Sequence, residues 1–170
     1  YPLYSKDWHN LLVFGDNLQI LKTFYENKDP LVKDKIKGKV KLIYIDPPFG
    51  TGDEYDGAKG QSAYSAKKKG ADFVEFLRRR LILLKELMAD DGAIFVRMDY
   101  HFGHYVKLVL DEVFGKENFL NEIIINRTNK QWEGVNRFNS ATDSLFLYSK
   151  TQNYNFNTIY RQRQKEAKWI

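Results

Sequence analysis

Short apolar runs alternate with segments of helical periodicity along most of this chain, and this alternation limits the folds open to it. Residues 40–45, Val-Lys-Leu-Ile-Tyr-Ile, form the clearest apolar run, which predicts a buried strand. Similar runs lie at 11–14 and 93–96, where we also expect buried strands. Because a helical segment lies between successive runs, the pattern predicts a parallel sheet with helices on both faces.

Three segments place apolar residues at helical spacing. They lie at 18–25, 73–89 and 105–113. We expect the second helix to be broken at 90–92, Asp-Asp-Gly, and the third at Gly115. Two further runs, 122–127 and 144–149, lie close together in sequence and predict an antiparallel pair. The predicted fold class is therefore α/β, with a mostly parallel sheet that has an antiparallel edge.

The composition excludes several classes of protein. The chain has 170 residues, of which 43% are hydrophobic, so one domain with a sizeable core can form. It has no cysteine and three histidines, so neither disulfides nor a metal site is predicted. No run of about 18 apolar residues is present, so we expect no membrane partner; the lack of a secretion signal favours the cytoplasm. The net charge of +5 agrees with a polyanionic partner.

Common catalytic and cofactor-binding motifs are absent from the sequence. It contains no Gly-x-x-x-x-Gly-Lys, Gly-x-Gly-x-x-Gly or Gly-x-Ser-x-Gly. A phosphate-cradling loop, the usual dinucleotide loop and a nucleophile elbow are therefore not predicted. What remains is the tetrapeptide Asp46-Pro47-Pro48-Phe49, which directly follows the clearest predicted strand.

This tetrapeptide is suited to holding a planar amine. Each proline fixes φ and removes a backbone donor, so the carbonyls are held rigid and left free to accept hydrogen bonds. The Asp46 carboxylate and a neighbouring carbonyl match the two hydrogens of an amine, and Phe49 offers a flat ring. Two acceptors would localise the nitrogen lone pair and stabilise positive charge that develops there. An Asp-Pro-Pro turn can also occur by chance in an ordinary loop.

Three acidic residues follow the predicted strands: Asp16, Asp46 and Asp99. Ligands of open α/β sheets lie outside the carboxyl ends of the strands, so these carboxylates mark one candidate site. A structural role stays open for two of them. Asp16 can cap the helix that follows it, and Asp99 can have a purely structural role.

The region around the tetrapeptide resembles the catalytic motif of amino-DNA methyltransferases, in particular the β-ordered group that includes modification subunits of type III restriction systems. The matching residues are Ile43-Tyr44-Ile45-Asp46-Pro47-Pro48-Phe49-Gly50-Thr51-Gly52. The similarity continues in Phe14-Gly15-Asp16-Asn17-Leu18, in 80–87, in 91–96 and in 110–119, and covers roughly residues 11–150. It implies a Rossmann-like methyltransferase sheet and the methyl donor S-adenosylmethionine.

The resemblance also implies residue roles. Asp46 and Pro47 would hold the target amine, Pro48 would shape the turn, and Phe49 would stack on a flipped-out base. Asp16 would lie near the adenine of the cofactor, within a cofactor-binding segment that comprises Phe14, Gly15, Asp16 and Asn17. Aspartate at position 46 favours adenine N6 as the target over cytosine N4. A methyltransferase that acts on RNA or on protein glutamine, and a non-catalytic DNA-binding remnant, also stay open.

The sequence departs from the family pattern at two points. Phe49 stands where the family more often has tyrosine. The cofactor loop Phe-x-Gly-x-Gly is not found after the catalytic motif, so we expect the chain to be C-terminally incomplete and inactive in isolation. Residues 1–150 would be part of the catalytic domain, and 151–170 a tail that the pattern does not place.

Basic residues near the predicted site are candidates for binding double-stranded DNA. They are Lys67, Lys68, Arg127 and Lys130. Basic side chains neutralise phosphates, although solvated loops would carry the same residues. The consecutive arginines at 78–80 are expected on a solvated helix face. A restriction subunit and a second copy of the chain are further partners that the resemblance leaves open.

Overall fold

The computed structural model describes residues 10–47, 55–56, 62–64, 70–127, 136, 142–158 and 160. The elements in chain order are α1 (Asn17–Glu26), β1 (Val40–Ile45), β2 (Tyr55–Asp56), β3 (Ser62–Tyr64), α2 (Ala71–Leu87), β4 (Met88–Asp99), α3 (Gly103–Phe114), the 3-10 helix η1 (Lys116–Asn118), β5 (Phe119–Asn126) and β6 (Thr142–Ser149).

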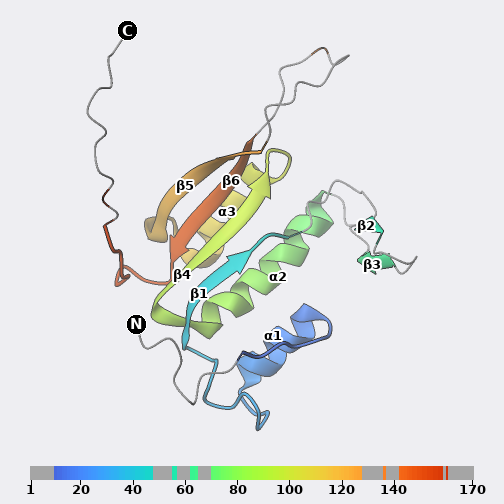
Figure 1. Ribbon diagram of the computed structural model, residues 1–170, viewed down its shortest axis with the longest axis vertical. Helices are drawn as coiled ribbons and strands as arrows, with labels where there is room; N and C mark the ends of the chain where they lie inside the picture. The colour runs from blue at the N-terminus through green and yellow to red at the C-terminus, as the bar shows by residue number, and fades with distance from the viewer. Residues whose placement is uncertain are drawn as a thin grey trace.

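Among the described residues, the main sheet has four strands in the order β1-β4-β6-β5 (Figure 1). β1 and β4 are parallel, while β6 runs antiparallel to both β4 and β5. Helix α2 connects the two parallel strands, as the alternating sequence pattern predicts. The α/β fold class with an antiparallel edge is therefore confirmed. β2 and β3 form a separate antiparallel pair between β1 and α2.

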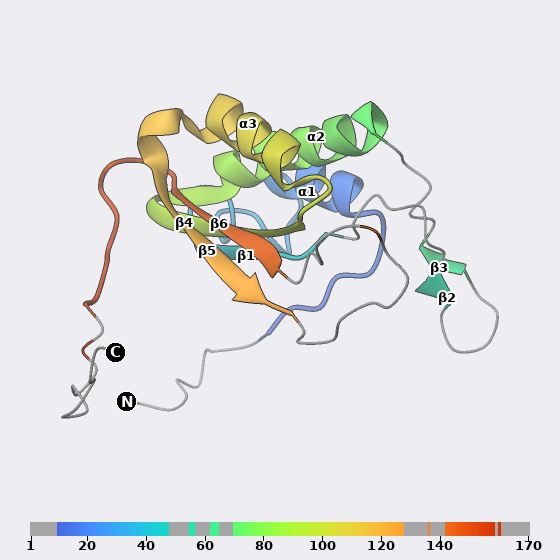
Figure 2. The ribbon, with the colours of Figure 1, turned by 90° about the horizontal axis from the view of Figure 1, so that it is seen from above.

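The helices of the described chain all lie on one face of the sheet (Figure 2). On β4 the side chains of Ile94, Val96 and Met98 are fully buried in a core that they share with α2 and α3. The alternate side chains Phe95 and Arg97 are only partly buried. In this part of the chain, helices on both faces, as predicted, are not observed. None of its helices is long and apolar enough to cross a membrane.

Residues 11–14 do not form the buried strand that the sequence predicted. Leu12 and Phe14 are fully exposed, and this segment has no strand assignment. An apolar run becomes a strand only when it has a partner edge and a covered face. The main sheet ends at β1 on this side, and residues 11–14 do not pair with that strand in the described structure.

The boundary between α2 and β4 also differs from the prediction. The helix ends at Leu87, and Met88 already belongs to β4, where it pairs with Val40. Residues 90–92 therefore lie within the strand, beside a shift in register between Val40 and Leu42. A Cβ on Gly92 would come within 2.7 Å of the Val40 carbonyl oxygen, so the close approach of the two backbones requires glycine.

Candidate active site

A cavity of about 510 Å³ lies between α1, the carboxyl end of β1 and α2. Its apolar walls are Val13, Ile20, Leu21, Phe76, Leu77 and Leu84. Its polar lining includes Asn17, Asp46, Pro47 and Arg80. The cavity thus brings together one residue of the predicted cofactor segment and two residues of the predicted catalytic tetrapeptide, although the two motifs are about 30 positions apart in the sequence.

Asp46 lies directly after β1 at the rim of this cavity, and its side chain is 40% exposed. Among the described residues its one recorded side-chain partner is Arg97, whose Nη1 donates to Asp46 Oδ2 over 2.9 Å. The register of β1 and β4 explains this pair: Ile45 lies opposite Val96, so the next residue on each strand comes side by side. The carboxylate is consequently held at one oxygen by a cation of the neighbouring strand.

The two prolines remove the nearest backbone donors with which Asp46 could close a turn. An aspartate at a strand end usually accepts from the N–H groups that follow it, most often two residues on. At Asp46 the next two residues are Pro47 and Pro48, and neither has an N–H. The Asp46 carboxylate therefore lacks its most usual local donor, which favours contacts with partners from other segments.

Asp99 ends the neighbouring parallel strand and has the opposite environment. Its side chain is 4% exposed. Oδ1 accepts from the backbone N–H groups of His101 (3.1 Å) and Phe102 (3.3 Å), and Oδ2 lies 2.7 Å from His101 Nδ1. These contacts close the turn that leads from β4 into α3. Asp99 therefore has the structural role that the sequence analysis left open.

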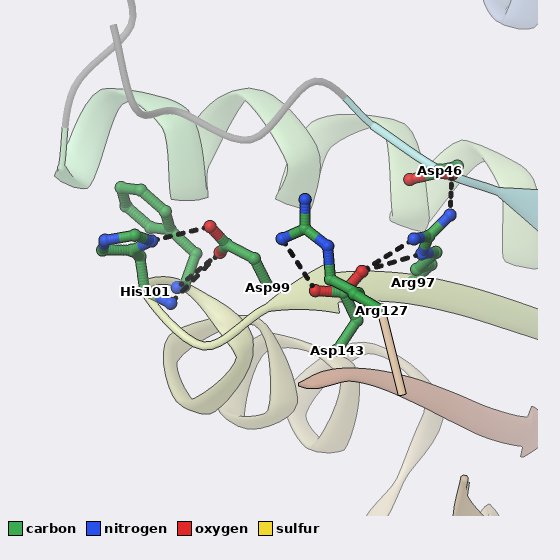
Figure 3. A network of polar contacts seen from close by, with 7 residues as sticks. Asp46, Arg97, Asp99, His101, Arg127 and Asp143 are labelled. Carbon is green, nitrogen blue, oxygen red and sulfur yellow. Dashed lines mark hydrogen bonds and ion pairs between the residues drawn. The ribbon is translucent and has the colours of Figure 1, made fainter. Parts of the chain in front are cut away.

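Four charged residues of alternating sign cross the rim of the main sheet (Figure 3). Beyond its contact with Asp46, Arg97 donates through Nε (3.0 Å) and Nη2 (2.8 Å) to Asp143 Oδ2. Arg127 Nη1 lies 3.3 Å from Asp143 Oδ1. The Asp143 side chain is completely buried between the two guanidinium groups. Hydrogen bonding to Asp143 raises the pKa of Arg97, and the charges of Asp46 and Asp143 act in the same direction.

The predicted cofactor segment reaches the cavity at its last residue. Asp16 caps α1 by accepting from the Gln19 N–H over 3.1 Å, as the sequence allowed. Asn17 lines the cavity, and its Oδ1 accepts from Arg80 Nε over 2.8 Å. Phe14 and Gly15 do not contribute to the lining.

Arg80 corrects the expectation that residues 78–80 form a solvated face. Arg78 and Arg79 are on the surface and pair with Glu112 and Glu75. Arg80 is instead buried: it donates to Asn17 on α1, and its guanidinium lies 3.3 Å from the centre of the Phe76 ring. A run of three charged residues on a helix covers most of its circumference, so one of them has to point toward a packed neighbour.

The remaining predicted site residues divide into described and undescribed ones. Arg127, a predicted DNA contact, lies just after β5 and is paired with Asp143. Pro48, Phe49, Lys67, Lys68 and Lys130 lie outside the described residues.

Sequence reasoning did not single out Arg97 or Asp143. Both interrupt or begin otherwise apolar strands, Arg97 between Val96 and Met98 and Asp143 just before Ser144. Each lies one residue beyond a predicted strand, 93–96 or 144–149, and two opposite charges that adjoin buried strands are a usable signal, because buried charges require partners. The hydrophobic pattern does not specify the strand order that brings them together.

Comparison with known proteins agrees with the resemblance of the Asp46–Phe49 motif to that of amino-DNA methyltransferases. A family model described as DNA methylase matches residues 40–169. The type II methyltransferase M.EcaI of Enterobacter cloacae is 36% identical over 132 residues, which are 78% of this chain and 29% of that protein. The probable HindVI Mod subunit of a type III restriction-modification enzyme from Haemophilus influenzae is 34% identical over 176 residues, covering 94% of this chain and 22% of that protein.

The chain therefore belongs to the N6/N4 DNA methylase family, and the resemblance that its sequence carries is confirmed. It spans less than a third of the length of these two relatives.

Solved structures show the same fold at low sequence identity. The complex of M1.HpyAVI with SAM has a TM-score of 0.56 at 17% identity and covers 89% of this chain and 58% of its own. The cytosine-N4-specific PvuII DNA methyltransferase has a TM-score of 0.55 at 15% identity and covers 82% of this chain and 48% of its own. The described structure is thus a Rossmann-like methyltransferase sheet.

Proposed function

We propose that this chain carries the target-amine site of a DNA methyltransferase that uses S-adenosylmethionine and methylates adenine N6. The observation that supports this most directly is the position of Asp46 and Pro47. Both line a cavity of about 510 Å³ at the carboxyl end of a parallel strand, and the two prolines after Asp46 add carbonyl acceptors but no backbone donors.

The acceptors of this turn suit an amine that is conjugated to a base. The nitrogen lone pair of such an amine is delocalised into the ring, so the amine is a weak nucleophile. The Asp46 carboxylate and the Pro47 carbonyl would accept its two hydrogens and favour a pyramidal nitrogen. As the nitrogen–methyl bond formed, the methyl–sulfur bond of the donor would break and release its thioether. The nitrogen would then carry positive charge, which the carboxylate would stabilise until a proton left for solvent. Phe49 is proposed to stack on the base.

The cavity suits the methyl donor. Its volume lies within the range of about 300–1,000 Å³ that is common for small-molecule sites, and its apolar walls surround a few polar groups. S-adenosylmethionine, when bound, supplies an electrophilic methyl group. Asn17, held by Arg80, and the preceding residues Phe14, Gly15 and Asp16 are proposed to bind it. The apolar side chains Ile20 and Leu21 would pack against its flat adenine ring.

Double-stranded DNA is the proposed substrate. The net charge of +5 favours a polyanion, and Lys67, Lys68, Arg127 and Lys130 are proposed phosphate contacts. Enzymes that modify a base extrude it from the duplex, which would bring the amine to Asp46. Because relatives are named as Mod subunits of restriction-modification enzymes, a role in restriction-modification with a restriction subunit as partner is part of the proposal.

The test is methyl transfer by the intact protein. It would be given labelled S-adenosylmethionine and mixed-sequence DNA, and the DNA would then be digested to identify the modified nucleoside. We expect N6-methyladenine, and a loss of at least about 100-fold in Asp46→Ala. Asp90→Ala is the matched control, since Asp90 is exposed at the opposite end of β4 and pairs with Lys150.

Two other results would change the proposal. N4-methylcytosine as the product would keep the amine chemistry and overturn the base assignment. DNA binding without methyl transfer by the intact wild-type protein would favour a non-catalytic DNA-binding remnant.

A further inference from the structure

Arg97 is placed to set the orientation of the proposed catalytic carboxylate. We propose that it is a positioning residue, which holds Asp46 in the orientation that accepts the target amine; this inference rests on the proposed function. Of the described side chains, Arg97 is the one recorded as contacting Asp46, and it comes from the strand beside it.

The guanidinium of Arg97 is itself anchored on its other side. Nε and Nη2 both donate to Asp143 Oδ2, and Asp143 is completely buried. These two bonds fix the plane of the guanidinium and leave Nη1 directed at Asp46 Oδ2. Because Asp143 is buried and charged, moving Arg97 would leave this carboxylate with Arg127 as its remaining described cation, which is unfavourable.

The contact with Arg97 determines which oxygen of Asp46 faces the target amine. With Oδ2 occupied by Arg97, the carboxylate cannot rotate freely, and Oδ1 is the oxygen left to accept a hydrogen from the amine. Two backbone N–H groups fix Asp99, and the one two residues on has no counterpart at Asp46, because Pro48 stands there. Arg97 thus performs for Asp46, across strands, the orienting role that the backbone performs for Asp99. Lysine would keep the charge but not the planar fork that joins two carboxylates.

The experiment compares Arg97→Met, Arg97→Lys and Arg79→Met in the intact protein. Arg79 is a matched surface arginine that pairs with Glu75 on its own helix. We expect Arg97→Met to lower kcat by about 10- to 100-fold while KM for DNA and for S-adenosylmethionine stays within about 3-fold, because misplacement of a reacting group reduces the rate of the bound complex. Arg97→Lys should recover part of the loss, and Arg79→Met should match the wild type.

A cycle with Asp46→Asn separates positioning from general damage. If Arg97 acts through Asp46, adding Arg97→Met to Asp46→Asn should lower the single-turnover rate by less than about 3-fold. Thermal unfolding of each variant would identify those that are unfolded, and Arg97→Lys, which retains a cation beside Asp143, carries the comparison if Arg97→Met does not fold.

The outcomes distinguish this inference from the proposed function. An active wild-type protein whose folded Arg97→Met or Arg97→Lys variant keeps the wild-type kcat would overturn the positioning role alone. Equal, independent losses from Arg97 and Asp46 would also overturn it. An inactive wild-type protein would overturn the proposed function and this inference with it.

Discussion

Asp46 and Asp99 end neighbouring parallel strands at the same edge of the sheet, yet their environments are opposite. Asp99 is nearly fully buried and accepts three hydrogen bonds from the two residues that follow its turn. Asp46 is 40% exposed, lines the cavity and is contacted by a single described side chain, Arg97. The same residue type at equivalent positions therefore serves the fold in one case and offers free acceptor capacity in the other.

The cause of this difference lies in the residues that follow. After Asp99 the chain has backbone N–H groups at His101 and Phe102 that turn back to the carboxylate. After Asp46 the chain has two prolines, so the equivalent donor two residues on does not exist. A carboxylate at a strand end of an α/β sheet is thus a candidate catalytic group when the residues after it lack the backbone N–H groups that usually bind it.

The largest expected effect on stability comes from Asp143, on which the Asp46 side of the rim depends. Asp143→Ala removes a buried carboxylate that balances Arg97 and Arg127. We expect the free energy of unfolding to fall by about 3 kcal/mol, because breaking a buried ion pair strands the remaining charges. Urea denaturation would measure this, with exposed Asp90→Ala as the control. A loss below about 1 kcal/mol would show that the rim does not need its buried anchor.

The second prediction compares how much Asp99 and Asp46 contribute to the free energy of unfolding. Asp99→Ala leaves the His101 and Phe102 N–H groups without their acceptor, and we expect a loss of about 2 kcal/mol in the free energy of unfolding. Asp46→Ala should change it by less than about 0.5 kcal/mol, since its carboxylate is 40% exposed and Arg97 keeps its bonds to Asp143. Equal losses in the two variants would contradict the comparison.

A smaller effect follows from restoring a backbone donor after Asp46. Pro48→Ala supplies an N–H two residues after Asp46, where Asp99 has that of His101. We expect kcat for methyl transfer to fall by about 10-fold, equivalent to about 1.4 kcal/mol, because the turn would compete for the carboxylate. Pro30→Ala, in the loop before β1, is the control for loss of a proline. An unchanged kcat would argue against the role of the missing donors.

The smallest expected effect is the pH-dependent stability that Asp111 contributes, a carboxylate away from the rim that accepts hydrogen bonds from Lys107 and Tyr148. Hydrogen bonds from Lys107 and Tyr148 hold the pKa of Asp111 below its ordinary value, although burial, the largest single influence, acts to raise it. A lowered folded-state pKa gives stability that is present above the unfolded value of about 3.9 and is lost as the pH falls through the folded value. Wild-type protein should therefore lose more stability between about pH 5 and pH 2 than Asp111→Asn does.

Urea denaturation across this pH range would measure the difference. Parallel curves for the two proteins would show that Asp111 contributes no pH-dependent stability.

Much of the fold could be predicted because local pattern and tertiary structure agree there. Residues 40–45 form a strand with the predicted bounds, and the third helix ends at Gly115 as expected. The predictions are wrong where strand pairing determines the secondary structure. Residues 11–14 have the composition of a buried strand but no partner in the described sheet, and Met88 fits the helical spacing of α2 yet pairs with Val40.

The candidate site could be predicted in part for the same reason. Asp46 and Pro47 are adjacent in the sequence, and their chemistry is readable from the tetrapeptide alone. Arg97 and Asp143 are 46 positions apart, and their contact depends on β6 lying beside β4. The hydrophobic pattern indicates that both segments are strands, but it does not specify which strands become neighbours.

The most direct test of the comparison is the single-turnover rate of methyl transfer by Asp46→Asn and Asp99→Asn, measured on folded, intact protein with saturating DNA and S-adenosylmethionine. We expect Asp46→Asn to be slower than the wild type by at least about 100-fold, because an amide cannot stabilise the charge that develops on the amine. Asp99→Asn should stay within about 5-fold, since its contacts serve the turn into α3. A slow Asp99→Asn beside a nearly normal Asp46→Asn would contradict the assignment of chemistry to Asp46.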